Sequence, residues 1–208
     1  MSLKKILPLF LIFISFVLAI YFYPHSPSTM VTHWGIYGEP NGYSSNFFAL
    51  FFMPILSFFL YLLFRYLPQT DPYHSNFKKF EKYFDTFINI FFIFLFYLYF
   101  LTLIWNLFSP FNLTQFLTPA FAFLFYYIGV LLTVAKRNWF VGIRNPWTMS
   151  SDSIWQKTHL LGGKLFKIAA LLSLVGVILP KLAIYLVLVP IILISLFLYL
   201  YSYLLSRS

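Results

Sequence analysis

The sequence predicts an all-α integral membrane protein with six transmembrane helices, both termini in the cytoplasm and one shaped extracellular loop. Three observations lead to this fold class: the composition, a series of long apolar segments and a one-sided distribution of positive charge. Of the 208 residues, 61% are hydrophobic and 9% are charged, whereas a soluble domain has about 25% charged residues. A soluble core could not bury 29 Phe, 16 Tyr and 5 Trp with so few charges. The absence of cysteine excludes disulfides and cysteine-ligated metal sites.

Six segments are long enough to cross a bilayer, which requires about 20 residues. The fifth is purely apolar only over residues 168–179, so its helix must begin earlier. Ser150 and Ser151 are good N-caps, and Asp152 suits a helix N-terminus. The predicted spans cover residues 6–23, 47–64, 86–108, 116–135, 152–179 and 182–205.

Local sequence features refine these spans. The first segment lacks a small-residue cleavage site before Pro24, so we expect a retained span and not a signal peptide. Pro54 should kink the second span, and Pro119 should lie in the first turn of the fourth. The apolar segments are continuous and not alternating, so the pattern of a membrane barrel is absent and no sheet is needed.

The basic residues predict the orientation. Thirteen of the 14 Lys and Arg residues fall at the two termini and in the second and fourth loops, and Lys181 falls on the other side. The positive-inside rule therefore places both termini in the cytoplasm and residues 24–46 outside a cell membrane that the chain crosses several times. Most of these charges are expected to set topology and to meet the headgroups of the lipid bilayer. No direct nucleic-acid partner is expected, because the aromatic residues lie in spans or at interfaces.

The external loop, residues 24–46, is predicted to have a defined shape. Its three glycines and its Asn-Gly pair favour tight turns with positive φ. One interpretation is a binding surface, and another is a folded cap with its aromatic rings at the membrane interface. A metal held by His25, His33 and Glu39 is a third interpretation, although the spacing matches no metal motif, and we predict neither metal nor cofactor. The candidate ligand-binding residues are His33, Trp34, Tyr37, Glu39, Asn41 and Tyr43.

The cytoplasmic loop, residues 136–167, contains three of the five tryptophans. Gly142 and Asn145-Pro146 impose turns, and Trp147 is expected in the headgroup layer. Arg144 can donate hydrogen bonds to a carboxylate, for which Asp85 is a candidate, or to backbone carbonyls. The alternative interpretation is an interfacial re-entry that anchors the fifth helix.

The polar residues of this second loop resemble the signature of the SdpI family of membrane immunity proteins. Asn145 stands where the family usually has Thr and preserves the turn chemistry. The signature residues are Asn138, Gly142, Arg144, Pro146, Trp147, Thr148, Trp155 and His159, followed by Gly162 and Gly163. The external motif His33-Trp34-x3-Gly38-Glu39-Pro40-Asn41-Gly42-Tyr43 resembles the N-terminal domain of unknown function that often precedes this signature. The resemblance implies one membrane domain, residues 1–208, with a two-span unit at 1–64 and a four-span unit at 86–208.

The resemblance also implies a function. The protein would protect a cell against a secreted, membrane-active toxin peptide that meets the external loop. It would also signal by sequestering a repressor-type protein in the cytoplasm. Neither role requires catalysis, so we predict that the chain is not an enzyme.

Two other classes of protein remain as alternatives. A small transporter or channel needs ionisable side chains within its spans. The predicted spans contain the polar residues Asn89, Thr102, Asn106, Thr133 and Ser173, but no Asp, Glu, Lys or Arg is expected deep within them. An intramembrane hydrolase needs a nucleophile–base pair or a metal set at one depth. Here His33 and Glu39 are predicted outside, while Asp152 and His159 are predicted inside.

Overall fold

The computed structural model describes residues 3–207, and it describes the side chains of residues 6–207. Within that part of the chain, six helices are long and apolar enough to cross a membrane, which confirms the predicted helical membrane fold. They are α1 (Leu3–Phe22), α2 (Asn46–Tyr66), α4 (Glu81–Leu107), α5 (Leu113–Val134), α7 (Asp152–Val175) and α8 (Ala183–Arg207). The shorter elements are η1 (Tyr23–His25), β1 (Thr29–Trp34), β2 (Pro40–Ser45), η2 (Leu67–Thr70), α3 (His74–Lys78), α6 (Pro146–Ser150) and η3 (Pro180–Leu182).

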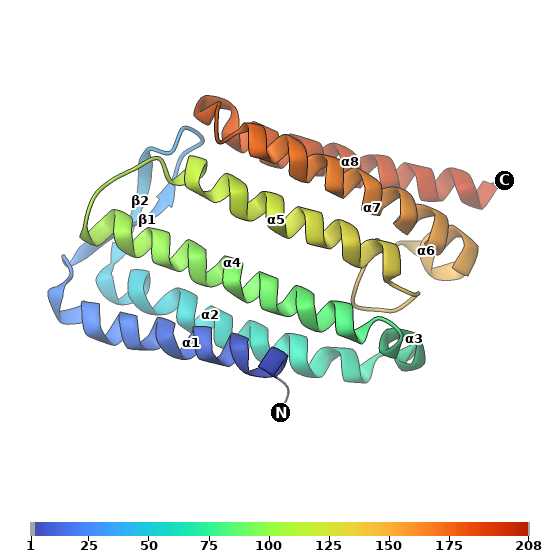
Figure 1. Cartoon of the computed structure of the whole chain (residues 1–208), viewed down its shortest axis with the longest axis horizontal. Helices are drawn as coiled ribbons and strands as arrows, with labels where there is room; N and C mark the ends of the chain where they lie inside the picture. Colours follow the sequence, from blue (N-terminus) through green and yellow to red (C-terminus); the bar gives the residue numbers. More distant parts are fainter. Residues whose placement is uncertain (1–2, 208) are drawn as a thin grey trace.

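The helices form two groups of three that lie side by side (Figure 1). Helices α1, α2 and α4 pack together, as do α5, α7 and α8, and α4 packs against α5 to join the groups. We call the end with β1 and β2 the hairpin end, and the opposite end, with α3, α6 and residues 135–151, the signature end. Successive spans alternate in direction, so α1 runs toward the hairpin end and α8 runs away from it (Figure 1).

The close packing of α5 on α7 depends on small residues. A Cβ atom added to Gly129 would lie 2.7 Å from the carbonyl oxygen of Gly163, so any larger residue would force the two helices apart. Small residues at helix contacts allow close backbone approach inside membranes. This contact fixes where α7 starts relative to the end of α5, and therefore where the signature residues meet.

Two details of the predicted spans are wrong. Pro119 is not in the first turn of its helix, because α5 begins earlier, at Leu113, where the Asn112 side chain accepts a hydrogen bond of 3.1 Å from the Gln115 N–H. The fifth span ends at Val175 and not at residue 179, because the chain turns at Gly176. Its predicted start is correct: Ser151 is the N-cap, and its hydroxyl accepts from the Ile154 N–H at 3.4 Å.

The external loop contains a two-stranded antiparallel hairpin, although the sequence analysis required no sheet. Val31 of β1 pairs with Tyr43 of β2. The Asn106 side chain of α4 acts as a second strand partner: its Oδ1 accepts from the Val31 N–H at 2.7 Å, and its Nδ2 donates to the Val31 carbonyl at 3.0 Å. Met30 is buried beside Leu50. The hairpin is therefore held by Asn106 of α4, which pairs with β1, and by the packing of Met30 against the neighbouring helix α2.

Glycine conformation in the hairpin differs from the prediction. Among the hairpin glycines only Gly38 has a positive φ, of 84°. Gly42 instead lacks a side chain because a Cβ atom there would lie 2.7 Å from the Cβ atom of His33 on the facing strand. The Asn-Gly pair is thus explained by close strand packing and not by a left-handed turn.

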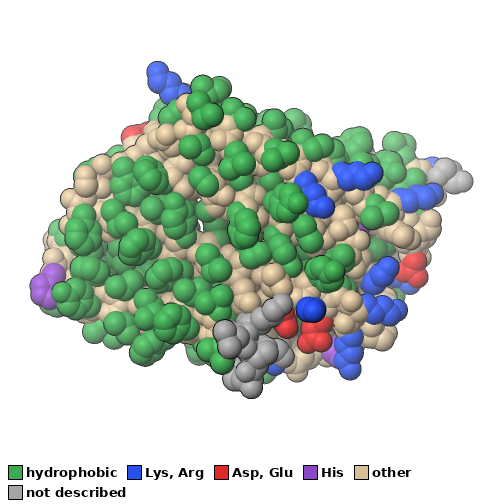
Figure 2. All heavy atoms as spheres, in the orientation of Figure 1, with side chains coloured by type: hydrophobic (Ala, Val, Ile, Leu, Met, Phe, Trp, Pro, Cys, Tyr) green, Lys and Arg blue, Asp and Glu red, His purple; other side chains and the backbone are tan. Residues whose placement is uncertain are grey.

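Positive charge gathers at the signature end, while hydrophobic side chains cover the middle of the face shown in Figure 2. This is the distribution expected of a protein whose middle lies in lipid. The positive-inside rule predicts that the signature end faces the cytoplasm.

Cysteine labelling checks this orientation, because the chain has no cysteine of its own. Asn41 at the hairpin end and Ser150 at the signature end are both exposed. We expect Asn41→Cys to react with a membrane-impermeant maleimide in intact cells, and Ser150→Cys to react only after lysis. The reverse pattern would place the hairpin in the cytoplasm.

Candidate functional site

The hairpin covers a pocket of about 780 Å³ that we call the hairpin pocket. Its walls come from α2 and α4 on one side and from α5 and α8 on the other. The helical lining is mainly apolar and includes Phe52, Leu98, Leu117, Phe121 and Leu188. The volume lies within the range of about 300–1,000 Å³ that is usual for ligand pockets. The site can therefore receive an apolar group.

The hairpin reaches this position through contacts with both groups of helices. Gly38 lies over the start of α5, where an added Cβ atom would be 2.7 Å from Oδ1 of Asn112. Tyr37 lies beside Tyr185 of α8. The rings of Trp34 and Trp105 of α4 meet edge to face, with their centres 5.6 Å apart. The roof of the pocket is therefore seated on three spans.

The hairpin pocket brings together four of the six residues that the sequence analysis selected. These four are His33, Trp34, Glu39 and Asn41. The other two, Tyr37 and Tyr43, are 59% and 60% exposed and do not line the pocket. A ring nitrogen of His33 lies 2.5 Å from the side-chain oxygen of Asn41. The Glu39 carboxylate accepts from the Tyr37 N–H at 3.1 Å. Polar side chains of the hairpin thus stand over helical walls that are mainly apolar.

The proposed metal triad is not assembled. His25 contacts the Tyr21 carbonyl, with its Nδ1 atom 2.9 Å away, while His33 and Glu39 contact Asn41 and Tyr37. Across the described residues, no group of three or more His, Asp or Glu side chains is placed to hold a metal ion.

Most of the pocket lining could not be found from the sequence. Hydropathy does not separate an apolar side chain that faces lipid from one that faces a cavity. Thr102 and Asn106 were recognised as polar positions within a predicted span, and both line the pocket. The indole N–H of Trp34 is buried and has no acceptor among the described residues, which is uncommon for a buried donor.

At the signature end, Asn138 organises the chain between α5 and α7. Its side chain is fully buried. The amide Nδ2 donates to the carbonyls of Lys136 and Val141 at 2.8 and 2.9 Å. Its Oδ1 accepts from the N–H groups of Phe140 and Val141 at 2.8 and 2.7 Å. One side chain therefore makes four hydrogen bonds to backbone groups of a turn that has no regular secondary structure to pair those groups.

Asn145 begins the short helix α6 with a capping box. Its Oδ1 accepts from the Thr148 N–H at 2.9 Å, and the Thr148 hydroxyl lies 3.0 Å from the Asn145 N–H. The Asn145 Nδ2 also donates to the Ser202 hydroxyl at 2.7 Å. The Trp147 ring packs against the rings of Tyr199 and Tyr203, with 5.1 and 5.0 Å between the ring centres. The signature thus anchors α8.

Trp155 and His159 form the inner layer of the signature end. The Trp155 indole donates to the Ala135 carbonyl at 2.9 Å. The His159 Nε2 accepts from the Ile143 N–H at 2.9 Å, so the other ring nitrogen, Nδ1, carries the proton and donates to the Trp155 carbonyl at 2.7 Å. Gly142, with a φ of 120°, passes against both rings. The buried histidine is therefore fully used in holding the loop.

Arg144 does not pair with Asp85. Its guanidinium donates to the Trp139 carbonyl, which is the backbone alternative considered from the sequence. Asp152 forms an ion pair with a different arginine, Arg137, with 2.9 Å between its Oδ1 atom and Nε of Arg137. From the sequence, Arg137 was expected only to set the membrane topology. Its ion pair with Asp152 was not predicted, because the two residues are 15 positions apart across a turn.

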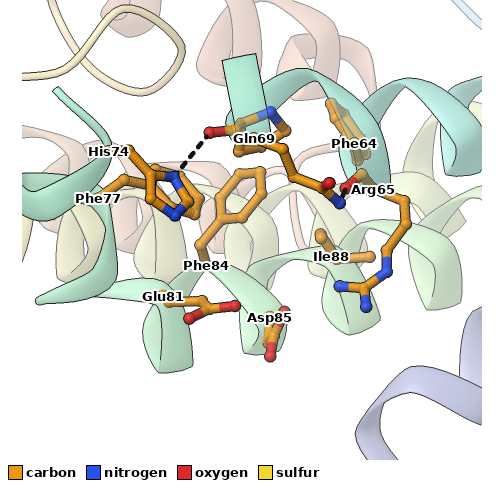
Figure 3. Close-up of a pocket in the computed structure, with 10 residues that line it drawn as sticks. Phe64, Arg65, Gln69, His74, Phe77, Glu81, Phe84, Asp85 and Ile88 are labelled. Carbon is orange, nitrogen blue, oxygen red and sulfur yellow. Dashed lines mark hydrogen bonds between the residues drawn. The ribbon is translucent and has the colours of Figure 1, made fainter. Parts of the chain in front are cut away.

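Asp85 lines a separate polar pocket of about 430 Å³ at the signature end. Figure 3 shows Glu81 and Asp85 of α4 on one side, and Arg65, Gln69 and His74 around the rest of the opening. The Gln69 side chain donates to the Arg65 carbonyl at 3.0 Å. No motif in the sequence marks this pocket, since its residues come from four elements: the end of α2, η2, α3 and the first part of α4.

Lys167 was counted with the basic residues of the cytoplasmic loop, and it also falls within the predicted fifth span, residues 152–179. In the structure it belongs to α7. Its ammonium nitrogen lies 5.8 Å from the centre of the Tyr126 ring, and its stem lies against Gly129. A cation–π contact of this kind stabilises a lysine at such a position.

Comparison with protein families agrees with the resemblance seen in the sequence, which is thereby confirmed. Residues 10–58 match a domain of unknown function, DUF1648, and residues 134–202 match the SdpI/YfhL protein family. The first match covers most of α1, the hairpin and the first part of α2, and the second covers residues 135–151, α7 and most of α8. No curated protein and no solved structure shows significant similarity to the chain.

Proposed function

We propose that this multi-pass membrane protein, in which a DUF1648 region precedes an SdpI/YfhL region, protects its cell by binding a secreted, membrane-active peptide at the hairpin end. The observation that carries the proposal is the hairpin pocket, an apolar cavity with a polar roof at the end that we expect to face outward. A peptide that disrupts membranes must present an apolar segment to lipid, and the pocket offers that segment an alternative place.

The charges at the two ends support an external ligand that is itself positively charged. Glu39 is the only acidic residue of the external loop, and it lines the pocket. A carboxylate at the rim attracts a cationic peptide and raises its rate of association. The basic residues that would repel such a peptide gather at the opposite end (Figure 2).

The Trp34 indole supports a ligand with hydrogen-bond acceptors. Its N–H is buried without an acceptor among the described residues, and a backbone carbonyl of a bound peptide would supply one. Large aromatic residues at the centre of a binding site commonly dominate its affinity. Trp34 lines the pocket while Tyr37 and Tyr43 stand outside it, so the binding energy is expected to concentrate at Trp34.

The proposed mechanism is sequestration without catalysis. A peptide held between the two groups of helices is removed from the lipid in which it would assemble or insert. The signature residues contribute by holding α5, α7 and α8 in place, since Asn138, Thr148, Trp155 and His159 are buried and hydrogen-bonded to their own chain. A repressor-type partner in the cytoplasm would therefore meet exposed residues such as Arg144 and the rim of the polar pocket.

The test is protection of a sensitive bacterial host. We expect cells that make the chain to survive a higher dose of at least one purified, secreted, membrane-active peptide than cells that lack it. Leu188→Trp should fill the hairpin pocket and abolish that protection, whereas Leu193→Trp should retain it. Both leucines are exposed on α8, at 47% and 59%, but only Leu188 lines the pocket. Equal killing with and without the chain, at verified membrane levels, would contradict the proposal.

Three hairpin substitutions sharpen this experiment. Trp34→Ala should weaken binding by about 2 kcal/mol or more, and Tyr43→Ala should have a smaller effect. Glu39→Gln should reduce protection mildly, and less so at high salt, because an exposed charge is screened. Loss of protection in strict proportion to loss of folded protein would instead identify the hairpin as a structural cap.

A further inference from the structure

A second apolar pocket, of about 610 Å³, lies between the two groups of helices near the signature end. We call it the seam pocket. Its walls include Leu63 and Phe64 of α2, Phe87 of α4, Ile128 of α5 and Phe166 of α7, and Phe140 closes it from the signature loop. Since α2 belongs to one group and α7 to the other, the pocket lies along the seam between the two groups.

Arg144 lines the edge of the seam pocket. Its side chain is exposed, and the Trp139 carbonyl is the one hydrogen-bond acceptor that it reaches among the described residues. A guanidinium has five N–H donors in a planar fork. It forms no ion pair with any acidic side chain in the described part of the chain. The Arg144 guanidinium therefore has N–H donors available for a ligand, and it lies beside an apolar cavity.

We propose that the seam pocket binds one phospholipid with an anionic headgroup, with an acyl chain in the pocket and the phosphate on Arg144. Three observations select this ligand. The lining is apolar and suits an alkyl chain, the exposed arginine suits a phosphate through paired hydrogen bonds, and the pocket lies at the end where positive charge gathers. A soluble anion would meet a single cation and gain nothing from the apolar walls.

The seam pocket and the hairpin pocket both lie between the two groups of helices, the first near the signature end and the second at the hairpin end. The proposed lipid occupies the first. Both pockets take their walls from α2, α4 and α5. An apolar cavity inside the bilayer is surrounded by acyl chains, so occupation by lipid is its expected state, and Arg144 decides which headgroup is retained. This inference does not depend on peptide binding in the hairpin pocket.

The experiment uses the purified full-length chain with an equimolar mixture of phosphatidylglycerol and phosphatidylcholine that have identical acyl chains. Native mass spectrometry then counts the lipids that remain bound. We expect one tightly bound lipid with a roughly fivefold preference for phosphatidylglycerol, the selectivity expected of one basic residue near a lipid headgroup. Arg144→Gln should remove the preference, and Arg144→Lys should keep part of it.

Matched controls separate a local site from general attraction to positive charge. Lys78→Gln removes an exposed charge from the same end and should leave the preference unchanged. Leu63→Trp should fill the pocket and lower retention of both lipids, whereas Leu204→Trp should not, although both leucines are exposed on helices near the signature end, at 48% and 63%. If Arg144→Gln fails to fold, the comparison of the two tryptophan variants still decides whether the pocket holds a lipid.

Three results would overturn the proposal. The first is a preference that survives Arg144→Gln in folded protein. The second is unchanged lipid retention in Leu63→Trp. The third is displacement of phosphatidylglycerol by glycerol phosphate alone, which would identify a site for a free phosphate and not for a lipid.

Discussion

Replacing Asn138 with alanine is expected to remove most of the folded protein from the membrane. The substitution leaves two carbonyls and two N–H groups without the partner that the Asn138 side chain gives them. Each unsatisfied buried group costs about 1–3 kcal/mol, and the whole stability of a typical domain is about 5–15 kcal/mol. The measurement is the melting temperature of detergent-purified protein, together with its abundance in the membrane.

Two further variants make this result specific. Asn138→Asp keeps the acceptor for Phe140 and Val141 but loses both donated hydrogen bonds, so its melting temperature should also be far below that of the wild type. Lys136→Ala changes an exposed neighbour in the same segment and should melt as the wild type does. If Asn138→Ala melts within a few degrees of the wild type, the turn is held by contacts other than this amide.

Gly142→Ala is expected to have the second-largest effect, and its cause can be separated into two parts. The φ of 120° is unfavourable for any residue with a side chain, and such backbone strain costs about 1–3 kcal/mol. In addition, an alanine Cβ would collide with Nε2 of His159 and would lie 3.2 Å from the Trp155 ring. We expect a lower melting temperature and a lower yield of folded protein.

A double-mutant cycle identifies the collision. His159→Ala alone leaves the Ile143 N–H without its acceptor and should destabilise the protein. The combination of Gly142→Ala with His159→Ala should cost less than the sum of the two, because the side chain that the new methyl group meets is gone, and such couplings amount to about 0.5–3 kcal/mol. Additive effects would mean that backbone strain alone accounts for Gly142.

The six spans could be predicted because their length and apolarity are set by the bilayer, and no tertiary contact is needed to find them. The hairpin could not, because Val31 finds its second strand partner in Asn106, 75 positions later in the chain. A polar residue within a predicted span was visible in the sequence, but its partner was not.

The signature shows the same limit on a smaller scale. The residue types at Asn138, Gly142 and Asn145 predicted turns, and the structure contains them. The partner of Arg144 was proposed as Asp85, yet the turn presents the Trp139 carbonyl to the guanidinium instead. Which carbonyl a turn leaves available depends on its three-dimensional course, and residue spacing does not encode it.

The seating of the hairpin has a consequence for synthesis. The hairpin is made early, immediately after the first span, but Asn112 beneath Gly38 and Tyr185 beside Tyr37 leave the ribosome much later. During translation the hairpin therefore lacks its contacts with Asn112 and Tyr185 until the fourth and sixth spans have been made. The hairpin pocket can therefore be complete only after the final helix has begun to enter the membrane, and a chain that is still being made lacks the finished cavity.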